Sequence, residues 1–333
     1  MKKVSVVILN WNGRQLLEQF LPSVIRYTDT EIAEIIIADN NSEDDSLNFL
    51  ETDYPGLRII SLSKNYGFAE GYNRALDQID SQYVVLLNSD VEVTENWLST
   101  AIKYLDTNYD VVALQPKILS YKDKSSFEYA GAAGGFIDIY GYPFCRGRVF
   151  SKIEKDTGQY NDITDIFWAS GACMIIRLKE YKEVGGLDNN FFAHQEEIDL
   201  CWRLNARGKR IVCLPSSVVY HLGGATLKVE NPNKTYLNFR NNLLTLYKNL
   251  SGKYYRKVMN VRFLLDYLAA LQFFVAGKTR SARAVLRARQ DFKQMKEEYT
   301  QIRKENLEKT KVETPKGMYL KSILREYYIG GRK

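Results

Sequence analysis

The N-terminal part of the chain alternates short, continuous apolar runs with segments of helical periodicity. Val4–Leu9 is a β-branched run typical of a central parallel strand that is covered on both faces, and Arg14–Tyr27 follows it with apolar residues at helical spacing. Further apolar runs lie at Glu34–Ala38, Leu57–Leu62 and Tyr83–Leu87, with helical segments at Leu47–Leu50 and Phe68–Asp80 between them. This pattern predicts an α/β fold with a Rossmann-like, mostly parallel central sheet and flanking helices.

Polar residues follow the predicted strands at the point where each strand ends. The clusters are Asn10-Trp11-Asn12, Asp39-Asn40-Asn41-Ser42 and Asn88-Ser89-Asp90. The carboxyl ends of parallel strands lie at one edge of a sheet, and open α/β sheets bind their ligands there. We therefore expect the three clusters to line one binding site.

The segment from Gln115 to Asp165 is rich in glycine and aromatic residues and has no clear period, which predicts irregular strands and loops. Regular patterns return after this segment. They predict a strand within Ala169–Arg177, helices at Lys179–Val184 and Glu196–Ala206, and a strand at Ile211–Leu214.

Charge is distributed unevenly along the chain of 333 residues, whose net charge is +6. Of the 46 Lys and Arg residues and the 40 Asp and Glu residues, 20 and 8 lie after Ser251. This last region therefore carries +12, and the first 251 residues carry −6. We divide the chain into an α/β domain at residues 1–250 and a basic, mainly helical extension at residues 251–333.

Two helices are predicted in the extension. Val261–Ala276 is apolar over much of its circumference, and Thr279–Met295 places Arg280, Arg283, Arg287 and Lys293 among shorter apolar residues. A basic amphipathic helix of this kind can lie on an anionic membrane surface. The alternative is a helical hairpin that packs on the core or on a second subunit of a homo-oligomer and leaves its basic face in solvent.

The chain is expected to be cytoplasmic, with reduced thiols. Its four cysteines form no CxxC pair, and with only two histidines a zinc site is not expected. The apolar N-terminus lacks a small-residue cleavage site, so we interpret it as a buried strand and not as a signal sequence. The apolar stretch Val258–Gly277 contains Arg262 and Asp266 and fails the test of about 18 uninterrupted apolar residues for a membrane span.

Asp90 and His221 are candidate metal ligands, because each stands where an apolar strand ends. Mg²⁺ and Mn²⁺ prefer oxygen ligands, and a carboxylate at this edge is suited to hold a cation that bridges two phosphates. A histidine at a strand end can complete such a shell, and Gly223-Gly224 behind it permits close approach of a ligand. The structural alternatives are that Asp90 caps a turn and that His221 is an ordinary buried or surface residue.

Three acidic residues, Glu196, Glu197 and Asp199, open the predicted helix that follows Phe191-Phe192-Ala193-His194. The helix macrodipole favours acids in the first turn, which is a sufficient structural explanation. A carboxylate in a partly apolar cleft is also a suitable general base, so we hypothesise that one of the three is catalytic.

The segment Asn65–Asn73 places glycines and amides at a predicted helix start, which suits contacts to phosphate or ribose. Its spacing is not that of a P-loop, and no GxGxxG follows the first strand. A P-loop kinase and a dinucleotide oxidoreductase are therefore both poorly supported.

Seven segments, in this order, resemble the family 2 glycosyltransferases: VSVVILNWNG, IIIADNNSED, SKNYGFAEGYNRAL, VVLLNSDVEV, WASGACMIIR, EEIDLCWRL and VVYHLGG. The resemblance covers Val4 to Leu250 and is closest to the rhamnosyltransferase-like members that build bacterial surface polysaccharides. It implies a GT-A fold and an inverting transfer of a sugar from a nucleotide-diphosphate donor, UDP- or dTDP-linked, with Mg²⁺ or Mn²⁺ as cofactor. The acceptor implied is a hydroxyl of a glycan or of a lipid-linked sugar.

The resemblance also implies roles for individual residues. The residues expected to bind the nucleotide sugar are Asn10, Asn12, Asp39, Asn41, Ser42, Asn65, Gly67, Asn73, Ser89 and Arg240. Trp168, Ser170 and Gly171 match the loop beneath sugar and acceptor, where Trp168 either stacks on a sugar or fills the core. The metal ligands are Asp90, the last position of a DXD-type motif, and His221; Asn88 at the first position leaves the motif with one carboxylate.

The catalytic base of the family is the second acid of a Glu-Asp pair at a helix start, which matches Glu197, here Glu in place of Asp. Because the added methylene displaces the carboxylate by one C–C bond, Glu196 and Asp199 remain alternatives. The base deprotonates the acceptor hydroxyl as it attacks the anomeric carbon, and the metal stabilises the departing diphosphate.

A lipid-linked acceptor and the basic extension together predict a peripheral protein at the inner face of the plasma membrane, with no nucleic-acid partner. Two other functions are weighed against this one. A nucleotidyltransferase that makes nucleotide sugars needs a Gly-rich basic loop after the first strand, and NWNGRQLL has one Gly and one Arg. The presence of Glu196, Glu197, Asp90 and His221 argues against a non-catalytic membrane-associated scaffold.

Overall fold

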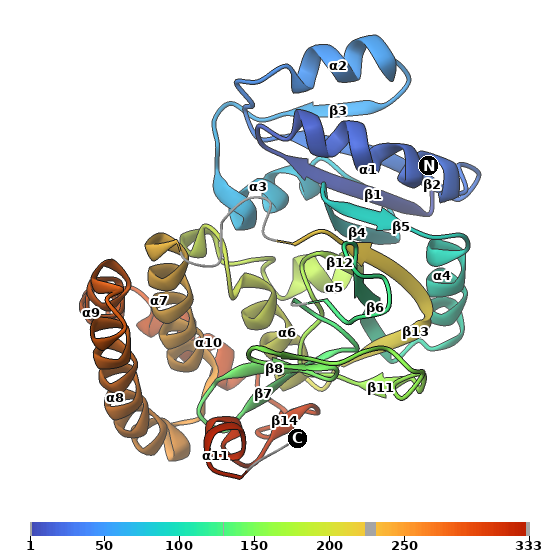
Figure 1. Ribbon diagram of the computed structural model, residues 1–333. Coiled ribbons are helices and arrows are strands. Elements are labelled where there is room, and N and C mark those ends of the chain that lie inside the picture. Colours follow the sequence, from blue (N-terminus) through green and yellow to red (C-terminus); the bar gives the residue numbers. More distant parts are fainter. Residues whose placement is uncertain (1, 129, 224–230, 331–333) are drawn as a thin grey trace.

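The computed structural model describes residues 2–128, 130–223 and 231–330, and its N-terminal half alternates strands and helices as the sequence predicts (Figure 1). These elements are β1 (Val4–Asn10), α1 (Arg14–Tyr27), β2 (Ala33–Asp39), α2 (Ser46–Asp53), β3 (Arg58–Ser61), α3 (Gly67–Leu76), β4 (Tyr83–Asn88), β5 (Val91–Val93) and α4 (Trp97–Thr107). The predicted helix at 14–27 has the bounds of α1, and the predicted α/β class is confirmed.

Within the described residues, the central sheet has nine strands in the order β11-β13-β6-β12-β4-β1-β2-β3, with β5 paired to β13. The later strands are β6 (Val111–Ser120), β11 (Thr164–Asp165), β12 (Cys173–Arg177) and β13 (Arg210–His221). β1 pairs in parallel with β2 and β4, and β6 with β13, whereas β12 runs antiparallel between β4 and β6. The sheet is therefore mixed, and the start of β12 lies at the same edge as the ends of β1 and β4.

The two faces of the sheet bury separate apolar clusters, because successive residues of a strand point to opposite faces. On β1, Val7 belongs to the cluster under α3, whereas Val6 and Ile8 belong to the cluster under α1 and α4. The helices α5 (Leu178–Glu183) and α6 (Glu196–Ala206) add to the α3 side, with Leu178 and Leu200 in its cluster. Packing on both faces explains why the strands read as continuous apolar runs.

One strand, β13, replaces the two short runs that the sequence suggested at 211–214 and 218–220. It pairs with β6 along its length, with a shift of register between Leu214 and Val218. Pro215 lies in this interval and has no backbone N–H to donate, so the ladder is interrupted there without ending the strand.

The aromatic, glycine-rich middle segment forms a small second sheet of order β10-β9-β8-β7-β14. Its strands are β7 (Gly135–Asp138), β8 (Pro143–Cys145), β9 (Arg148–Val149), β10 (Lys152–Ile153) and β14 (Met318–Tyr319). Because β14 comes from the basic extension and pairs with β7, the end of the chain returns to the α/β body. The backbone N–H of Ile323 also donates to the buried carboxylate of Asp138.

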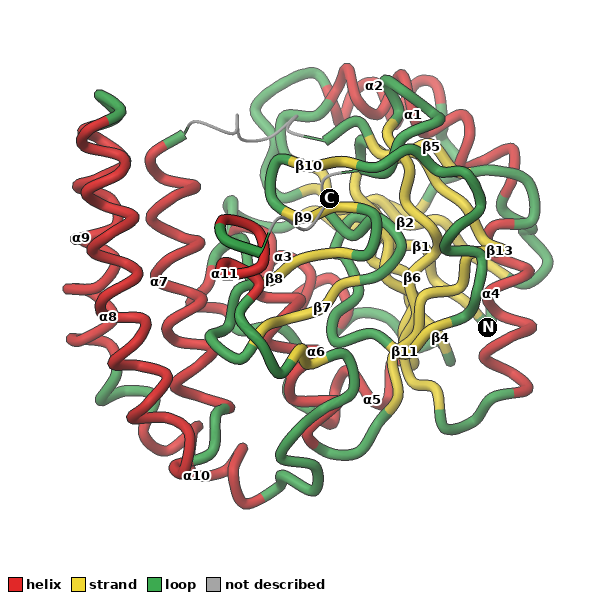
Figure 2. Tube along the Cα trace, turned by 60° about the horizontal axis from the view of Figure 1, so that its bottom comes forward, coloured by secondary structure: helices red, strands yellow, loops and turns green. Residues whose placement is uncertain are grey.

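The extension is mainly helical, with α8 (Gly252–Val275), α9 (Thr279–Met295), α10 (Thr300–Glu308) and α11 (Ile323–Tyr328) following α7 (Pro232–Asn249). Figures 1 and 2 show α8 and α9 at the outer edge of the molecule, with α7 between them and the α/β body. Within the described residues, α8 is long and apolar enough on average to cross a membrane by length and composition alone, and Arg262 and Asp266 interrupt its apolar stretch as expected.

Candidate active site

The ends of β1 and β2 are joined by a hydrogen-bonded group of polar side chains. Asn10 Nδ2 donates to Asp39 Oδ1 at 3.1 Å and to Ser42 Oγ at 3.1 Å, and the backbone N–H of Ser42 donates to Asp39 Oδ2 at 2.9 Å. Asp39 and Asn10 are buried, whereas Ser42 is partly exposed. The structure therefore brings these three predicted nucleotide-binding residues together at the carboxyl edge of the sheet.

The outer rim of this edge is formed by exposed residues. Asn12 is exposed, and its Oδ1 accepts the backbone N–H of Glu43 at 2.7 Å. Asn41 is exposed and has a left-handed backbone with φ of 62°, which Asn tolerates better than most residues. Trp11 is 47% exposed although it follows a buried strand, and an exposed indole at a strand end offers a stacking surface for a base.

The loop between β3 and α3 is joined to the loop after β2 by Asn40. The sequence predicted no individual role for this residue. Its Nδ2 donates to Asn65 Oδ1 at 3.1 Å and to the carbonyl of Gly67 at 2.9 Å, while its Oδ1 accepts the backbone N–H of Tyr66. Asn65 and Gly67 thus sit beside the Asp39 group, as expected of residues that line one site.

The start of α3 is covered by the segment that precedes α6. The backbone N–H groups of Phe68 and Ala69 donate to the carbonyl of Phe192 at 2.6 and 3.2 Å. A Cβ on Gly67, whose φ is 74°, would lie 2.5 Å from the Phe192 ring, so only glycine permits this approach. The α3 amides that we expected to face ribose and phosphate are therefore used inside the protein.

Asn73 is likewise engaged inside the protein, since its Nδ2 donates to the carbonyl of Leu187 at 2.8 Å and its Oδ1 accepts the Leu187 N–H at 3.0 Å. In the structure Asn73 fastens α3 to residues 187–189 and does not present its amide to a ligand.

Asp90 and His221 come together at the junction of β5 and β13. His221 Nε2 lies 3.1 Å from Asp90 Oδ1, and the backbone N–H of Leu222 donates to the Asp90 carbonyl. On the other side of the ring, Nδ1 lies 3.3 Å from Glu128 Oε2, and Glu128 is buried. Burial alone lowers the pKa of His221, but Asp90 and Glu128 outweigh it and raise that pKa to about 10. The pair is therefore set in a pocket that stabilises positive charge.

These residues fit a divalent cation that a diphosphate helps to hold. The described residues contain no group of three or more His, Cys, Asp and Glu side chains arranged around a metal position. Mg²⁺, however, is commonly held by one or two side chains, waters and substrate phosphates. The 3.1 Å between Nε2 and Oδ1 is about the spacing of neighbouring ligands in an octahedral shell with bonds of ~2.1 Å. Glu128 beside Nδ1 leaves Nε2 for the metal, as carboxylate–histidine pairs do. Gly224 lies outside the described residues.

Glu196 and Glu197 stand at the first turn of α6 with little compensation for their burial. The Oε2 atom of each carries no hydrogen bond from the residues that the structure describes. Burial raises the pKa of Glu197 to about 7, and burial together with the charge of Glu197 raises the pKa of Glu196 well above its usual value. Glu196 is buried, whereas Glu197 is partly exposed as a residue although its Oε2 is buried.

The segment before α6 has an unusual backbone: Phe192, His194 and Gln195 all have φ between 63° and 74°. Left-handed conformations cost free energy for residues other than glycine, and here α7 supplies compensation. Asn241 Nδ2 donates to the carbonyls of Phe191, Ala193 and His194 at 2.8–3.0 Å.

Arg240, which we expected to pair with the diphosphate, donates from Nη2 to the carbonyls of Asn190 and Phe191. In the structure it holds this same segment, next to Asn241.

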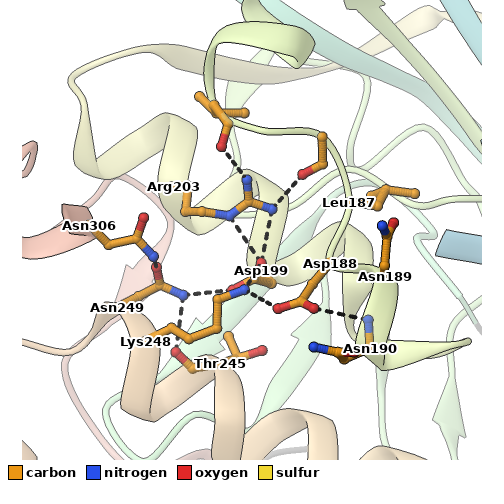
Figure 3. A network of polar contacts seen from close by, with 12 residues as sticks. Leu187, Asp188, Asn189, Asn190, Asp199, Arg203, Thr245, Lys248, Asn249 and Asn306 are labelled. Carbon is orange, nitrogen blue, oxygen red and sulfur yellow. Dashed lines mark hydrogen bonds and ion pairs between the residues drawn. The ribbon is translucent and has the colours of Figure 1, made fainter. Parts of the chain in front are cut away.

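Asp199 differs from the two glutamates in being fully paired (Figure 3). It is buried, and its Oδ2 accepts from Lys248 Nζ at 2.8 Å and Arg203 Nε at 3.0 Å, while its Oδ1 accepts from Asn249 Nδ2 at 2.8 Å. Burial alone raises the pKa of Asp199, but Lys248 and Arg203 outweigh it and lower that pKa. A carboxylate with these donors and this burial is suited to hold structure and not to accept a proton from a substrate.

The Asp199 network also fixes residues 188–190, which precede the strained segment. Lys248 bridges Asp199 to Asp188, whose Oδ1 accepts the backbone N–H of Asn190 at 3.1 Å. Figure 3 shows Asp188 and Asp199 converging on Lys248, with Asn249 linked onward to Asn306 of α10. Helices α6, α7 and α10 are thereby joined to residues 188–190.

Trp168, Ser170 and Gly171 lie at the same edge as the ends of β1 and β4. Trp168 is buried, and its Nε1 donates to the carbonyl of Phe136 at 2.9 Å, which is the core alternative that the sequence left open. Ser170 Oγ donates to the carbonyl of Ala130, and a Cβ on Gly171 would lie 3.1 Å from the Phe68 ring.

The same segment connects the sheet edge to α6. The backbone N–H of Asn88 donates to the Ala172 carbonyl, and the N–H of Ala169 contacts Cys201 Sγ at 3.5 Å. Glu197 is one helical turn before Cys201 and so shares its face. Burial is the main cause of the raised pKa of the Cys145 thiol, and the charges of Glu128 and Glu197 add to it. Glu197 and Glu128, the residue that contacts His221, thus both act on the Cys145 thiol.

The α/β fold is that of glycosyltransferases of GT-A type, which are its structural neighbours. The solved structure of GalNAc-T7 with UDP, GalNAc and Mn²⁺ superimposes on this chain with a TM-score of 0.59 at 16% identity, over 81% of this chain and 50% of that one. This chain therefore spans half the length of that neighbour.

Residues 5–185, more than half of the chain, match the Glycosyl transferase family 2 domain, and the chain belongs to that family. The rhamnosyltransferase WbbL of Escherichia coli (strain K12) is 26% identical over 263 residues, covering 75% of this chain and 93% of WbbL. An N-acetylglucosaminyl-diphospho-decaprenol L-rhamnosyltransferase of Mycobacterium tuberculosis (strain H37Rv) is 25% identical over 234 residues, covering 65% of this chain and 75% of that protein. The expected rhamnosyltransferase-like relationship is confirmed.

Proposed function

We propose that this chain is an inverting, metal-dependent glycosyltransferase that moves a sugar from a nucleotide-diphosphate donor to an acceptor hydroxyl in surface polysaccharide synthesis. The observation that carries the proposal is the buried Glu196–Glu197 pair, whose pKa values are raised by burial, in a fold that also holds an Asp90–His221 pair suited to a divalent cation. One group is poised to take a proton near neutral pH, and the other lies where a diphosphate leaves.

Glu197 is the base in this proposal. Its carboxylate accepts the proton of the acceptor hydroxyl, the oxygen forms a bond to the anomeric carbon, and the bond from that carbon to the diphosphate oxygen breaks with its electron pair. Attack from the face opposite the leaving diphosphate inverts the anomeric configuration. Glu196 is more deeply buried, and the charge of Glu197 adds to burial in raising its pKa. Asp199 is left out because its oxygens are already paired.

The leaving diphosphate is met by Asp90 and His221, with Glu128 setting the ring of His221. A divalent cation bound there supplies positive charge that stabilises the diphosphate as it departs. The nucleoside lies at the ends of β1 and β2, with Asp39 and Asn10 beneath it and Trp11 at its rim. The structural neighbour GalNAc-T7 was solved with UDP and Mn²⁺, which supports this choice of metal and donor class.

The acceptor in this proposal is a glycan or a sugar on a lipid carrier, and the donor is UDP- or dTDP-linked. Support comes from the mycobacterial relative, whose name specifies a lipid diphosphate acceptor, N-acetylglucosaminyl-diphospho-decaprenol. A soluble donor and a membrane-held acceptor meet at the inner face of the plasma membrane, so the enzyme acts there as a peripheral protein.

A panel of nucleotide sugars tests the function. We expect one donor to raise the melting temperature of the full chain when Mn²⁺ is present and to be slowly hydrolysed. Glu197→Gln keeps the stabilisation and loses the hydrolysis, whereas Glu51→Gln, a change at an exposed acid of α2, alters neither. The absence of stabilisation by every donor, with and without Mn²⁺, refutes the proposal. Unchanged hydrolysis by Glu197→Gln assigns the base to another residue.

A further inference from the structure

The middle of the long helix α8 is arranged in the reverse of a normal surface helix, because the charged Arg262 and Asp266 are buried and large apolar side chains point outward. Its exposed face carries Leu264, Tyr267, Leu268, Leu271, Phe274 and Val275, here called the α8 stripe, which are between 44% and 78% exposed. Their spacing places them on one side of the helix. Monomeric soluble proteins rarely expose a continuous apolar surface of this kind unless it contacts something.

The opposite face of α8 is bound to the rest of the protein by charged side chains. Arg262 is buried and donates to the Tyr140 carbonyl at 3.0 Å, to Asn242 and to Asp266 at 3.1 Å. Asp266, also buried, accepts from Arg289 of α9. These contacts fix which side of α8 faces outward, so the stripe is a permanent part of the surface.

Cations lie at both ends of the stripe. Lys253, Arg256 and Lys257 are exposed in the first turns of α8, and Lys278, Arg280 and Arg283 are exposed just after its end. These six residues are the flanking cations. Asp266 is the only acidic residue between Gly252 and Gln290, and it is buried and paired. The surface around the stripe is therefore cationic without exposed acids of its own helices.

We propose that the α8 stripe lies in the interface of an anionic lipid membrane, with the flanking cations on the lipid headgroups. An apolar helix face bordered by Lys and Arg binds such a surface by burying its apolar side chains and by electrostatic attraction. This inference deepens the proposed function and rests on it in one respect: an enzyme whose acceptor is lipid-linked needs a surface that binds the membrane.

A second copy of the chain fits the stripe less well. Two stripes placed face to face, in either direction, bring one set of flanking cations against another, and α8 has no exposed acid to pair with them. A membrane-spanning α8 fits less well too. Arg262 and Asp266 lie near the middle of the helix, and spanning would remove both from Tyr140, Asn242 and Arg289 and place them in the bilayer.

Co-sedimentation of the full chain with vesicles tests the proposal. The stripe variant carries Leu264→Gln, Leu271→Gln and Phe274→Gln, and the cation variant carries Arg256→Gln, Arg280→Gln and Arg283→Gln. Matched controls change exposed residues elsewhere: Tyr109→Gln with Ile153→Gln and Ile163→Gln for the stripe, and Lys103→Gln with Lys122→Gln and Lys179→Gln for the cations.

We expect the wild type to sediment with vesicles of phosphatidylcholine and phosphatidylglycerol and less with phosphatidylcholine alone. The stripe variant loses binding by about tenfold or more on both, because apolar burial drives insertion. The cation variant loses binding on the anionic vesicles only, and the controls bind as the wild type does. Alkaline carbonate releases the bound protein, whereas it does not release a protein that is held by a membrane-spanning helix.

Several results overturn the proposal: a stripe variant that sediments like the wild type, a wild type that ignores both vesicle types, or bound protein that resists carbonate. The same holds if the wild type self-associates without lipid and the stripe variant is monomeric in sedimentation velocity, since the stripe then joins copies of the chain. Donor hydrolysis without vesicles separates this outcome from the proposed function. Wild type and stripe variant hydrolyse donor equally if only the membrane proposal is wrong, and neither does so if the catalytic proposal is wrong.

Discussion

Buried charge serves different purposes at the start of α6 and in the hairpin of α8 and α9. Glu196 and Glu197 each have a carboxylate oxygen that is withdrawn from solvent and receives no hydrogen bond from the described residues. Asp266 in the hairpin accepts from both Arg262 and Arg289. An uncompensated buried acid favours its protonated form and destabilises the fold, whereas a paired acid stays ionised and fixes its neighbours. The first arrangement suits the base of the proposed mechanism, and the second suits an anchor.

The charge of the two parts of the chain follows the same division. The first 251 residues carry −6 and include Asp39 and Asp90 at the strand ends, where we propose that the donor and a cation bind. The remaining residues carry +12, most of it exposed, around an apolar helix face. Net charge averaged over the chain describes neither part, because the two parts carry net charges of opposite sign.

The largest expected effect comes from removing the reactive acid. Glu197→Gln keeps the size of the side chain and removes its ability to accept a proton, so transfer to the acceptor falls by about 10²–10⁴-fold. Single-turnover transfer with saturating donor measures the loss. The melting temperature does not fall at pH 8, since the change removes an uncompensated buried charge. If Glu197→Gln lowers the melting temperature and leaves turnover unchanged, Glu197 has a structural role like that of Asp266. The contrast drawn between the start of α6 and the hairpin of α8 and α9 is then wrong.

Asp199 lies on the same helix as Glu197, but like Asp266 it is a buried acid paired with a cation, in this case Lys248. It therefore tests the structural role of a paired acid. Lys248→Met leaves Asp188 and Asp199 buried with one cation fewer, and the free energy of unfolding falls by about 3–5 kcal/mol. Urea denaturation at pH 7 measures this, with Lys293→Met at an exposed position of α9 as control.

The loss in Lys248→Met also depends on pH. The ion pair lowers the pKa of Asp199 in the folded protein, so its stabilisation is present above the pKa of an unfolded Asp, about 3.9, and is lost as the pH falls through the folded value. The difference between wild type and variant therefore shrinks in acid. A difference that is constant from neutral to acidic pH argues that Lys248 acts by packing alone.

The activity of the wild type follows pH with the sign that a raised carboxyl pKa requires. Burial raises the pKa of Glu197 to about 7, so the base form is present above this pH and is lost below it. We expect kcat/KM to fall about tenfold for each pH unit below 7. Stability has the opposite slope: the folded state holds its proton more tightly, so stability falls as the pH rises towards 7. A rate that is flat down to pH 5 places the base elsewhere.

A smaller effect is expected at Glu128, which touches the ring of His221 and not the reacting atoms. Glu128→Ala removes the carboxylate beside Nδ1, and affinity for Mn²⁺ in the presence of UDP falls by about 10–100-fold. Glu128→Gln keeps an oxygen that accepts from Nδ1 and loses less. Electron paramagnetic resonance of Mn²⁺ measures binding directly, with Glu92→Gln on β5 as control. If both Glu128 variants bind Mn²⁺ as tightly as the wild type does, Glu128 does not contribute to the metal site.

Much of this arrangement could be predicted from sequence where a local pattern determines it. The apolar runs locate the strands, their polar ends locate Asp39 and Asp90, and the spacing of Arg14–Tyr27 gives the bounds of α1. Asp90 and His221 lie 131 residues apart, so no local pattern links them. Their pairing is suggested only by the family motifs in which both occur.

What sequence could not provide depends on contacts between distant segments. Asp199 is indistinguishable from Glu197 in an acidic first turn until Lys248, 49 residues later, is seen beside it. Glu128 lies in a segment without periodicity, so no pattern pointed to it. The roles of Asn73 and Arg240 differ from expectation for the same reason, because carbonyl groups of residues 187–191 occupy them.

The smallest effect is expected on the exposed face of α8, where the fold makes no use of the side chain. Leu271 is 56% exposed, so Leu271→Gln leaves the free energy of unfolding within about 0.5 kcal/mol of the wild type. Leu243→Ala, at a fully buried leucine of α7, costs about 2–5 kcal/mol in the same urea titration. If Leu271 adds nothing to stability although it stands in a row of exposed apolar side chains, that row is free to contact something outside the chain. If Leu271→Gln lowers the free energy of unfolding as much as Leu243→Ala does, the α8 stripe is packed in the core of the protein in solution. The stripe is then not a surface for a partner outside the chain.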